Sequence, residues 1–129
     1  MGHVPDDLRY TKDHEYVRPS AEAGVLIVGI TDYAQGELGD MVFVSLPKPG
    51  DRFEAHQTFG TVEAVKAVAD LFAPVAGEVV EVNGGLDGDP AAVNRDPYGE
   101  GWMIKLRADD PSALDGLLTA EAYRAHIGG

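Results

Sequence analysis

The sequence predicts a small, mostly β protein, a barrel or sandwich decorated with two or three short helices. Short runs of apolar and β-branched residues recur along the chain, and clusters of Gly, Pro, Asn and Asp separate them as turns would. Helical periodicity is confined to one short central segment and to the tail. The chain has 129 residues, of which 44% are hydrophobic, and this suffices for one domain with a packed core.

The first third of the chain should supply two strands and a helix. Residues 15–17 are a short strand candidate, and the near-continuous apolar run at residues 25–30 predicts a buried strand. Residues 31–32, Thr-Asp, then offer a helix N-cap. A short helix is therefore expected over residues 33–38. It should stop at Gly39, because glycine readily takes the backbone conformations that end helices.

The next strand is predicted at residues 41–46, where apolar residues alternate. Val42, Val44 and Leu46 should lie on one side of it. The strand should end before residues 48–51, whose sequence Lys-Pro-Gly-Asp is typical of a turn.

The centre of the chain predicts two strand-like arms on either side of a short apex. The incoming arm is residues 58–65, in which β-branched and small residues alternate. The returning arm covers residues 69–72, is broken by Ala-Pro at residues 73–74, and continues over residues 77–82. Lys66 lies near the apex, and loop tips of this kind are accessible to partners.

The last third should add one strand and a helical tail. Residues 102–107 alternate as a half-buried strand does, and the irregular loop before them should pack Trp102 and Tyr98 inward. Leucines at helical spacing then predict a helical tail at about residues 112–127. Thr119 is suited to cap its last helix.

Composition excludes several classes of function. The formal net charge is −12, with 22 acidic against 10 basic residues, so nucleic acid and anionic membranes are poor partners and basic protein surfaces are favoured. The absence of cysteine removes disulfides, thiolate metal sites and a cysteine nucleophile. Neither a membrane-spanning run nor a signal peptide is evident. The expected location is the cytoplasm, or the mitochondrial matrix for a mature imported form.

Lys66 is the residue whose surroundings suggest chemistry. Its neighbours Val65 and Ala67 are apolar, where an ordinary solvated loop tip would carry Gly, Asn, Asp or Ser. An acylated lysine loses its charge and gains a long flexible extension. If that extension ends in a dithiolane, it can accept a group on sulfur and cycle between disulfide and dithiol. Such a cofactor would suit a chain with no cysteine and no evident catalytic set.

At this point the sequence resembles the H proteins of the glycine cleavage system. The resemblance starts at the lipoyl-attachment segment, whose usual core reads ESVKA, and continues through ordered blocks along nearly the whole chain. These blocks are HEYV at residues 14–17, GITDYAQ at 29–35, LGDMVFVSLP at 38–47, VEAVKAVADLFAPVAGEVVEVN at 62–83, NRDPYGEGW at 94–102 and LLTAEAY at 117–123.

The resemblance implies a barrel-sandwich hybrid over residues 1–129, with lipoate in amide linkage to Lys66 on a hairpin tip. The protein would be a shuttle and not an enzyme, and a highly charged shuttle is expected to be a monomer. Glycine decarboxylase (P protein) would load an aminomethyl group, and aminomethyltransferase (T protein) would pass its carbon to tetrahydrofolate. Dihydrolipoamide dehydrogenase (L protein) would reoxidise the arm. A lipoate-attaching enzyme must first recognise the unmodified chain.

The resemblance also suggests roles for acidic residues. Glu63 matches the glutamate three residues before the family's lysine and would be read by the lipoate-attaching enzyme. Glu15 and Asp70 would lie near the resting cleft of the arm. With Glu37 they could form an acidic rim that holds the loaded arm's amine by a charge-assisted contact. For each acid a merely solvated position is the alternative, and His14 is expected to be structural or at the cleft edge.

The sequence departs from the family pattern at three positions. Ala64 replaces the usual serine before Val-Lys and stays small. Tyr16 replaces the usual tryptophan and keeps an aromatic body with a polar end. Glu37 stands where relatives often carry a polar or basic residue, and an acid there would favour a cationic group on the arm.

Two other functions stay open. One is a related carrier that donates lipoyl groups to other lipoyl-dependent complexes. The other is a small hydrolase that uses Glu15 and Asp70 as an acid pair. A biotin carrier is disfavoured, because its lysine usually lies between two methionines and not between Val65 and Ala67. Phosphate-loop, calcium-loop and metal-binding histidine patterns all fail on spacing, so no catalytic or metal-binding residues are expected.

Overall fold

Two antiparallel sheets form the framework of the protein. The computed structural model describes residues 3–128, so residues 1, 2 and 129 of the predicted domain lie outside the described part. The larger sheet contains, in spatial order, β1 (Arg9–Tyr10), β2 (Glu15–Pro19), β3 (Val25–Ile30), β9 (Ile104–Ala108), β8 (Gly77–Val82) and β5 (Arg52–Phe53). The smaller sheet contains β4 (Met41–Ser45), β6 (Thr58–Ala64) and β7 (Val68–Phe72).

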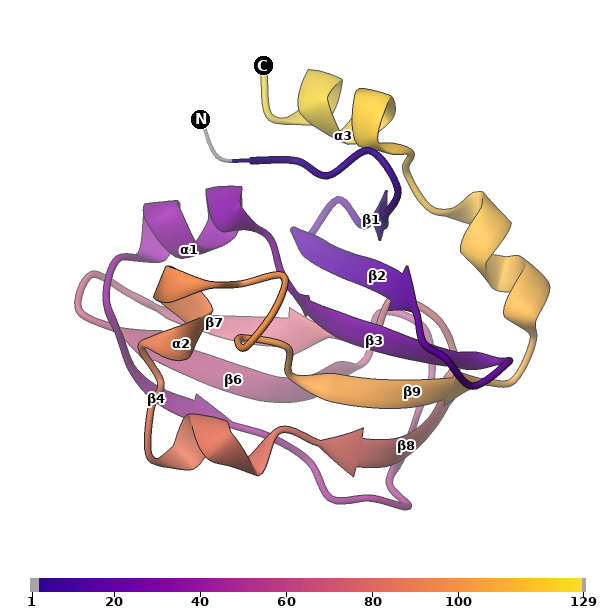
Figure 1. The fold of residues 1–129 in the computed structure, drawn as a ribbon, viewed down its shortest axis with the longest axis horizontal. Helices are drawn as coiled ribbons and strands as arrows, with labels where there is room; N and C mark the ends of the chain where they lie inside the picture. Colours follow the sequence, from indigo (N-terminus) through magenta and orange to yellow (C-terminus); the bar gives the residue numbers. More distant parts are fainter. Residues whose placement is uncertain (1–2, 129) are drawn as a thin grey trace.

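Short helices connect the strands and cover the ends of the sheets (Figure 1). The described residues form the α-helices α1 (Asp32–Leu38), α2 (Ala92–Arg95) and α3 (Ala120–His126), and the 3-10 helices η1 (Gly84–Asp87) and η2 (Pro111–Gly116). None of these helices is long and apolar enough to cross a membrane. The predicted mostly-β fold class with a few short helices is confirmed.

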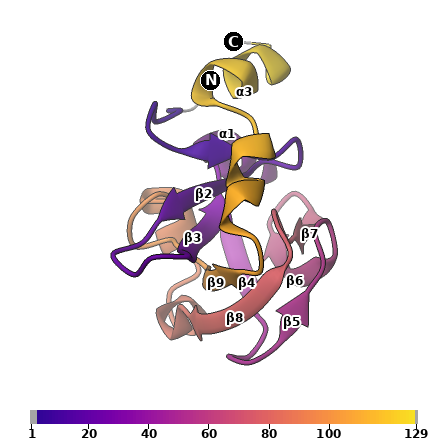
Figure 2. The ribbon, with the colours of Figure 1, turned by 90° about the vertical axis from the view of Figure 1, so that its right-hand side faces the viewer.

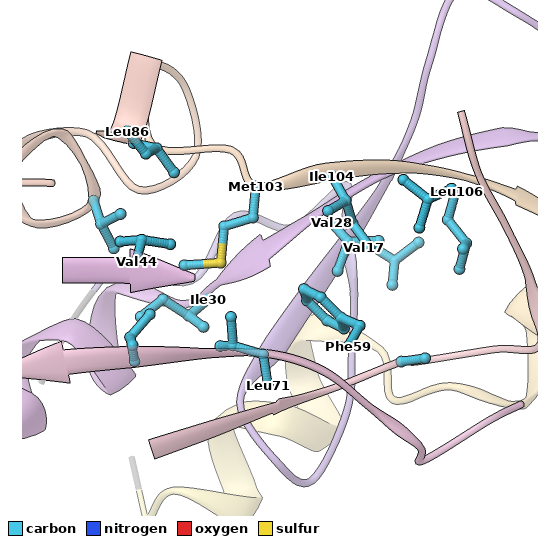
Figure 3. Packing of buried hydrophobic residues seen from close by; sticks show 14 of the residues in the cluster. Val17, Val28, Ile30, Val44, Phe59, Leu71, Leu86, Met103, Ile104 and Leu106 are labelled. Carbon is cyan, nitrogen blue, oxygen red and sulfur yellow. The ribbon is translucent and has the colours of Figure 1, made fainter. Parts of the chain in front are cut away.

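The two sheets face each other across one hydrophobic core. Figure 2 shows β2 and β3 on one side of the molecule and β6 and β7 on the other. Strand alternation directs one row of side chains from each sheet inward, and removing apolar area from water at about 25 cal/mol per Å² makes this the main stabilising contact. Figure 3 shows the packing of the core residues Val17, Val28, Ile104 and Leu106 from the larger sheet against Val44, Phe59 and Leu71 from the smaller one.

A second apolar cluster joins the two ends of the chain. It contains Val4, Leu8, Tyr10, Tyr16, Ala120 and Tyr123. The rings of Tyr10 and Tyr123 stack with centroids 4.6 Å apart, and Arg124 donates to the carbonyl oxygen of Val4 at 2.6 Å. Helix α3 therefore lies beside the N-terminal segment, above α1 and β2 (Figure 1).

Two predicted side-chain directions are wrong. Val42 is exposed and does not share the buried side of Val44, because the pairing of β4 with β6 shifts register between Met41 and Phe43. Trp102 is only half-buried, with the Lys105 ammonium 5.3 Å from its ring centroid, while Met103 takes the buried place. The chain enters β9 only at residue 104, so the alternation does not extend back to Trp102.

The tail is helical in two pieces. Helix η2 ends at Gly116, and Leu118 then pairs with Tyr10 in an isolated antiparallel bridge before α3 begins. Thr119 caps α3 as predicted, accepting from the Ala122 N–H at 3.2 Å. The leucines that suggested one helix pack in two places, Leu114 and Leu117 against the main core and Leu118 against the second cluster.

Candidate functional site

The β6–β7 hairpin presents Lys66 at its tip. The last strand pair is Glu63 with Val68, and the Ala64 N–H donates to the Ala67 carbonyl oxygen at 2.8 Å to close the turn. The Val65 N–H donates to the Asp40 carbonyl oxygen at 2.9 Å, which ties the tip to the segment between α1 and β4. The Lys66 side chain is exposed. The backbone on both sides of the lysine is thus fixed, while its amine is accessible.

The Lys66 stem lies against Gly39, the C-cap of α1. A side-chain carbon built on Gly39 would stand 3.4 Å from the Cγ and Cδ atoms of Lys66. Gly39 has φ of 88° and ψ of −163°, a conformation that is essentially restricted to glycine. Asn94 holds this segment in place, because its amide donates to the Gly39 carbonyl at 2.9 Å and its oxygen accepts from the Met41 N–H at 2.8 Å.

A pocket of about 320 Å³ opens between α1, β2 and β7. It is lined by Glu15, Glu37 and Asp70, the three acids that sequence analysis linked to an arm cleft, together with His14 and Tyr33. Glu15 is buried, whereas Glu37 and Asp70 are exposed at its edge. The structure therefore brings these three acids to one concave surface, although they are distant in sequence.

Glu15 is the unusual acid of this pocket. Its side chain is only 1% exposed. One carboxylate oxygen accepts from the Thr11 hydroxyl at 2.6 Å, and the other lies 3.4 Å from the Phe72 N–H. Burial raises the pKa of Glu15 to about 8, and these two hydrogen bonds offset only part of that rise. The pocket thus contains a carboxyl group whose raised pKa favours the neutral form.

His14 reaches the pocket from the residue before β2, with a left-handed φ of 71°. Its Nδ1 lies 2.8 Å from the Tyr123 hydroxyl, which lies 2.7 Å from the Thr31 hydroxyl. Thr31 is fully buried and already accepts from the Ala34 N–H. Among residues 3–128 the Tyr123 oxygen is the acceptor in reach of the Thr31 hydroxyl, so Tyr123 donates in turn to Nδ1 of His14.

This chain of hydroxyls favours a neutral His14 that carries its hydrogen on Nε2. Burial lowers the pKa of His14, and the neighbouring His126 lowers it further. Nearby Asp13 and Glu37 act in the opposite direction. Sequence analysis expected His14 to be structural or at the cleft edge, and it gave the Tyr123 hydroxyl no role. No local pattern could have revealed its hydroxyl contacts.

Glu63 lies outside this pocket. It is exposed and paired with Phe43 on one side and Val68 on the other. The tip lysine is not among the pocket-lining residues either. The candidate site thus has two parts, an accessible lysine with a neighbouring acid on the sheet and a separate acidic pocket. In residues 3–128 no group of three or more His, Asp or Glu side chains could hold a metal ion.

An accessible hairpin lysine on a small two-sheet scaffold, with a separate acidic pocket, is the arrangement expected of a carrier protein. A family model described as Glycine cleavage H-protein matches residues 8–128. The chain therefore belongs to the glycine cleavage H-protein family, the lipoyl carriers of that system, and the resemblance seen in the sequence is confirmed.

Similar proteins share nearly their full length with this chain. The glycine cleavage system H protein of Chlorobium limicola is 62% identical over 97% of this chain and 98% of its own length. That of Bacteroides thetaiotaomicron is 53% identical over the same shares. The crystal structure of a glycine cleavage system H protein from Mycobacterium marinum superposes with a TM-score of 0.88 at 41% identity, covering 98% of this chain and 100% of that one.

Proposed function

We propose that Lys66 carries lipoate in amide linkage and that the chain acts as a carrier without catalytic activity of its own. The observation that carries this proposal is the placement of Lys66, whose backbone is fixed on both sides while its amine stays accessible. An attached arm of this kind supplies the redox and group-transfer chemistry, and the protein supplies position and recognition.

Three enzymes would use the arm in turn. Glycine decarboxylase transfers an aminomethyl group to one sulfur, with reduction of the disulfide and release of carbon dioxide. Aminomethyltransferase passes the carbon to tetrahydrofolate and releases ammonia, and dihydrolipoamide dehydrogenase reoxidises the dithiol. The net charge of −12 favours enzymes with basic docking surfaces, and it favours a monomeric carrier, because copies of this chain repel one another. We place this cycle in the cytoplasm.

The acidic pocket is proposed to receive the loaded arm. An aminomethyl group is cationic at neutral pH, and Glu15, Glu37 and Asp70 line the pocket into which it would fold. A neutral His14 adds no like charge to this surface. A cation placed beside Glu15 would favour ionisation of that buried carboxyl, so docking of the amine should release a proton.

Glu63 is proposed to identify the hairpin to the lipoate-attaching enzyme. It is exposed, lies three residues before Lys66 and sits on β6 at a fixed register with Val68. A charged group held at a constant position relative to the lysine is a suitable recognition point for a basic side chain. Replacing Glu63 with Gln should slow lipoylation while leaving the fold unchanged.

Reconstituted glycine cleavage tests the proposal. Lys66→Arg keeps the charge of the tip but cannot form the lipoyl amide, so it should abolish turnover and leave thermal unfolding unchanged. Lys48→Arg, in an exposed turn far along the chain from the hairpin tip, is the matched control and should turn over normally. Turnover by Lys66→Arg would contradict the proposal. A lipoylated chain inactive with these three enzymes would instead indicate donation to other lipoyl-dependent complexes.

A further inference from the structure

Four large apolar side chains are strongly exposed in the described part of the chain, and all four lie at or beside the hairpin tip. They are Val42 (56% exposed), Phe43 (49%), Val65 (72%) and Val68 (68%). Val65 adjoins Lys66 directly, and Val68 follows it by two residues. We call this set the tip patch. Apolar groups gathered in this way, and not scattered singly, mark a surface that meets a partner.

Strand pairing places two members of the tip patch, Phe43 and Val68, on one face. Glu63 of β6 pairs with Phe43 of β4 and with Val68 of β7, and directly paired residues of antiparallel strands point to the same side of a sheet. The adjacent residue Val62 is buried in the core. Phe43, Glu63 and Val68 therefore form a row across the outer face of the smaller sheet, away from the core.

The register shift in β4 enlarges this patch. Without it, Val42 would follow the buried side of Val44, but the irregularity between Met41 and Phe43 leaves both Val42 and Phe43 exposed. A bulge costs ladder pairing and is normally retained for a reason. Here it leaves a second apolar side chain of β4 exposed to solvent.

We propose that the tip patch is the docking surface for the enzyme that acylates Lys66, and that this enzyme presents an apolar strip bordered by basic side chains. The inference rests on the proposed function of Lys66 and extends it to a surface. The position of the patch points to this occupant, because the patch adjoins the lysine and not the far end of an attached arm. An enzyme that acts on the lysine amine must cover the hairpin tip, whereas enzymes that act on the far end of a long acyl arm need not approach the tip.

Charge supports the same partner chemistry. Glu63 lies within the patch, and Asp40, which binds the Val65 N–H through its carbonyl, is exposed beside it. Acids around an apolar centre match the usual design of an interface, with a desolvated core and a polar rim. Basic side chains on the partner would pair with these acids and speed encounter with a chain of net charge −12.

Lipoylation kinetics of full-length variants test the proposal. The double variant Phe43→Ser/Val68→Ser removes the apolar groups at exposed positions, and Phe43→Leu/Val68→Ile, which keeps them, is the matched control. With purified lipoate ligase, lipoate and ATP, the serine variant should lose about tenfold in kcat/KM, because central apolar contacts dominate interfaces. The control should stay within about twofold of wild type. Unchanged thermal unfolding would show that the fold is intact.

A second measurement distinguishes a surface that serves the acylating enzyme alone from one that serves every partner. The serine variant is first driven to complete lipoylation by prolonged incubation, and it should then support glycine cleavage at the wild-type rate. An unchanged lipoylation rate would overturn the proposal, and so would equal losses in lipoylation and in turnover, because the patch would then serve every partner. Failure of wild-type Lys66 itself to be acylated would refute the proposed function instead.

Discussion

Replacing Glu15 with Gln should change how the stability of this protein depends on pH. Glu15 is buried beside the pocket, and burial raises its pKa from 4.5 to about 8. A carboxyl whose pKa is raised by folding is bound to a proton more tightly in the native state than in the unfolded chain. Its stabilising contribution is complete below pH 4.5 and is lost as pH rises through 8. Glutamine is neutral at every pH and has nearly the same shape.

The magnitude follows from the size of the shift. One pKa unit corresponds to about 1.4 kcal/mol, so the whole shift corresponds to up to about 5 kcal/mol of unfolding free energy. Between pH 5 and pH 8 Glu15 is protonated mostly in the native state and hardly in the unfolded chain, so most of that free energy is lost over this range. The wild-type protein should therefore lose about 3 kcal/mol relative to Glu15→Gln over this range. The Thr11 hydroxyl at 2.6 Å can still donate to the amide oxygen, so this hydrogen bond is preserved.

Urea unfolding of both proteins at pH 5, 6, 7 and 8 measures this difference directly. Comparing the change with pH, and not the absolute values, cancels the pH-independent effect of placing an amide near the Phe72 N–H. Glu121→Gln, at an exposed position on α3, is the matched control, and its free energy of unfolding should follow that of wild type at every pH. A difference between wild type and Glu15→Gln that stays constant from pH 5 to pH 8 would refute the view that Glu15 binds a proton in the native state.

The remaining predictions concern the support of the tip and the pocket. Asn94→Ala leaves the Met41 N–H and the Gly39 carbonyl without their partner and should lower the free energy of unfolding by about 2 kcal/mol in urea; an unchanged value would mean that water replaces the amide at no cost. Gly39→Ala should lose about 1–3 kcal/mol, because alanine is strained at φ of 88°; wild-type stability would contradict that backbone geometry. Tyr123→Phe should lose about 1 kcal/mol through its contact with the buried Thr31 hydroxyl, and a stabilised variant would contradict the hydroxyl chain. Asp70→Asn, at the pocket edge, should speed release of ammonia from the aminomethyl-loaded protein about two- to fivefold, followed by ammonia assay; equal rates would remove Asp70 from the arm cleft.

The hairpin could be predicted from sequence because its signals are local. Alternation of β-branched residues in β6, the Ala-Pro break after β7 and the small neighbours of Lys66 act within a few residues of each other. Thr119 could likewise be identified as a cap, since its hydroxyl binds a backbone N–H three residues away.

The pocket could not be assembled from sequence, because its contacts are distant along the chain. Glu15 and Asp70 meet only through the packing of two sheets, and the hydroxyls of Thr31 and Tyr123 are 92 residues apart. The exposure of Val42 was missed for a different reason. Alternation assumes an unbroken ladder, and the register shift in β4 reverses the side on which a residue lies.

The intact mass of the chain after incubation with lipoate ligase, lipoate and ATP, followed by peptide mapping, tests the central claim most directly. If Lys66 carries the arm as proposed, the chain should gain a single lipoyl increment, located on the peptide that contains Lys66. Lys66→Arg, whose tip keeps its charge, should gain no mass. An unmodified wild-type chain under a ligase that modifies a control carrier would contradict the assignment of Lys66 as the lipoyl-bearing residue, and so would an increment mapped to another lysine.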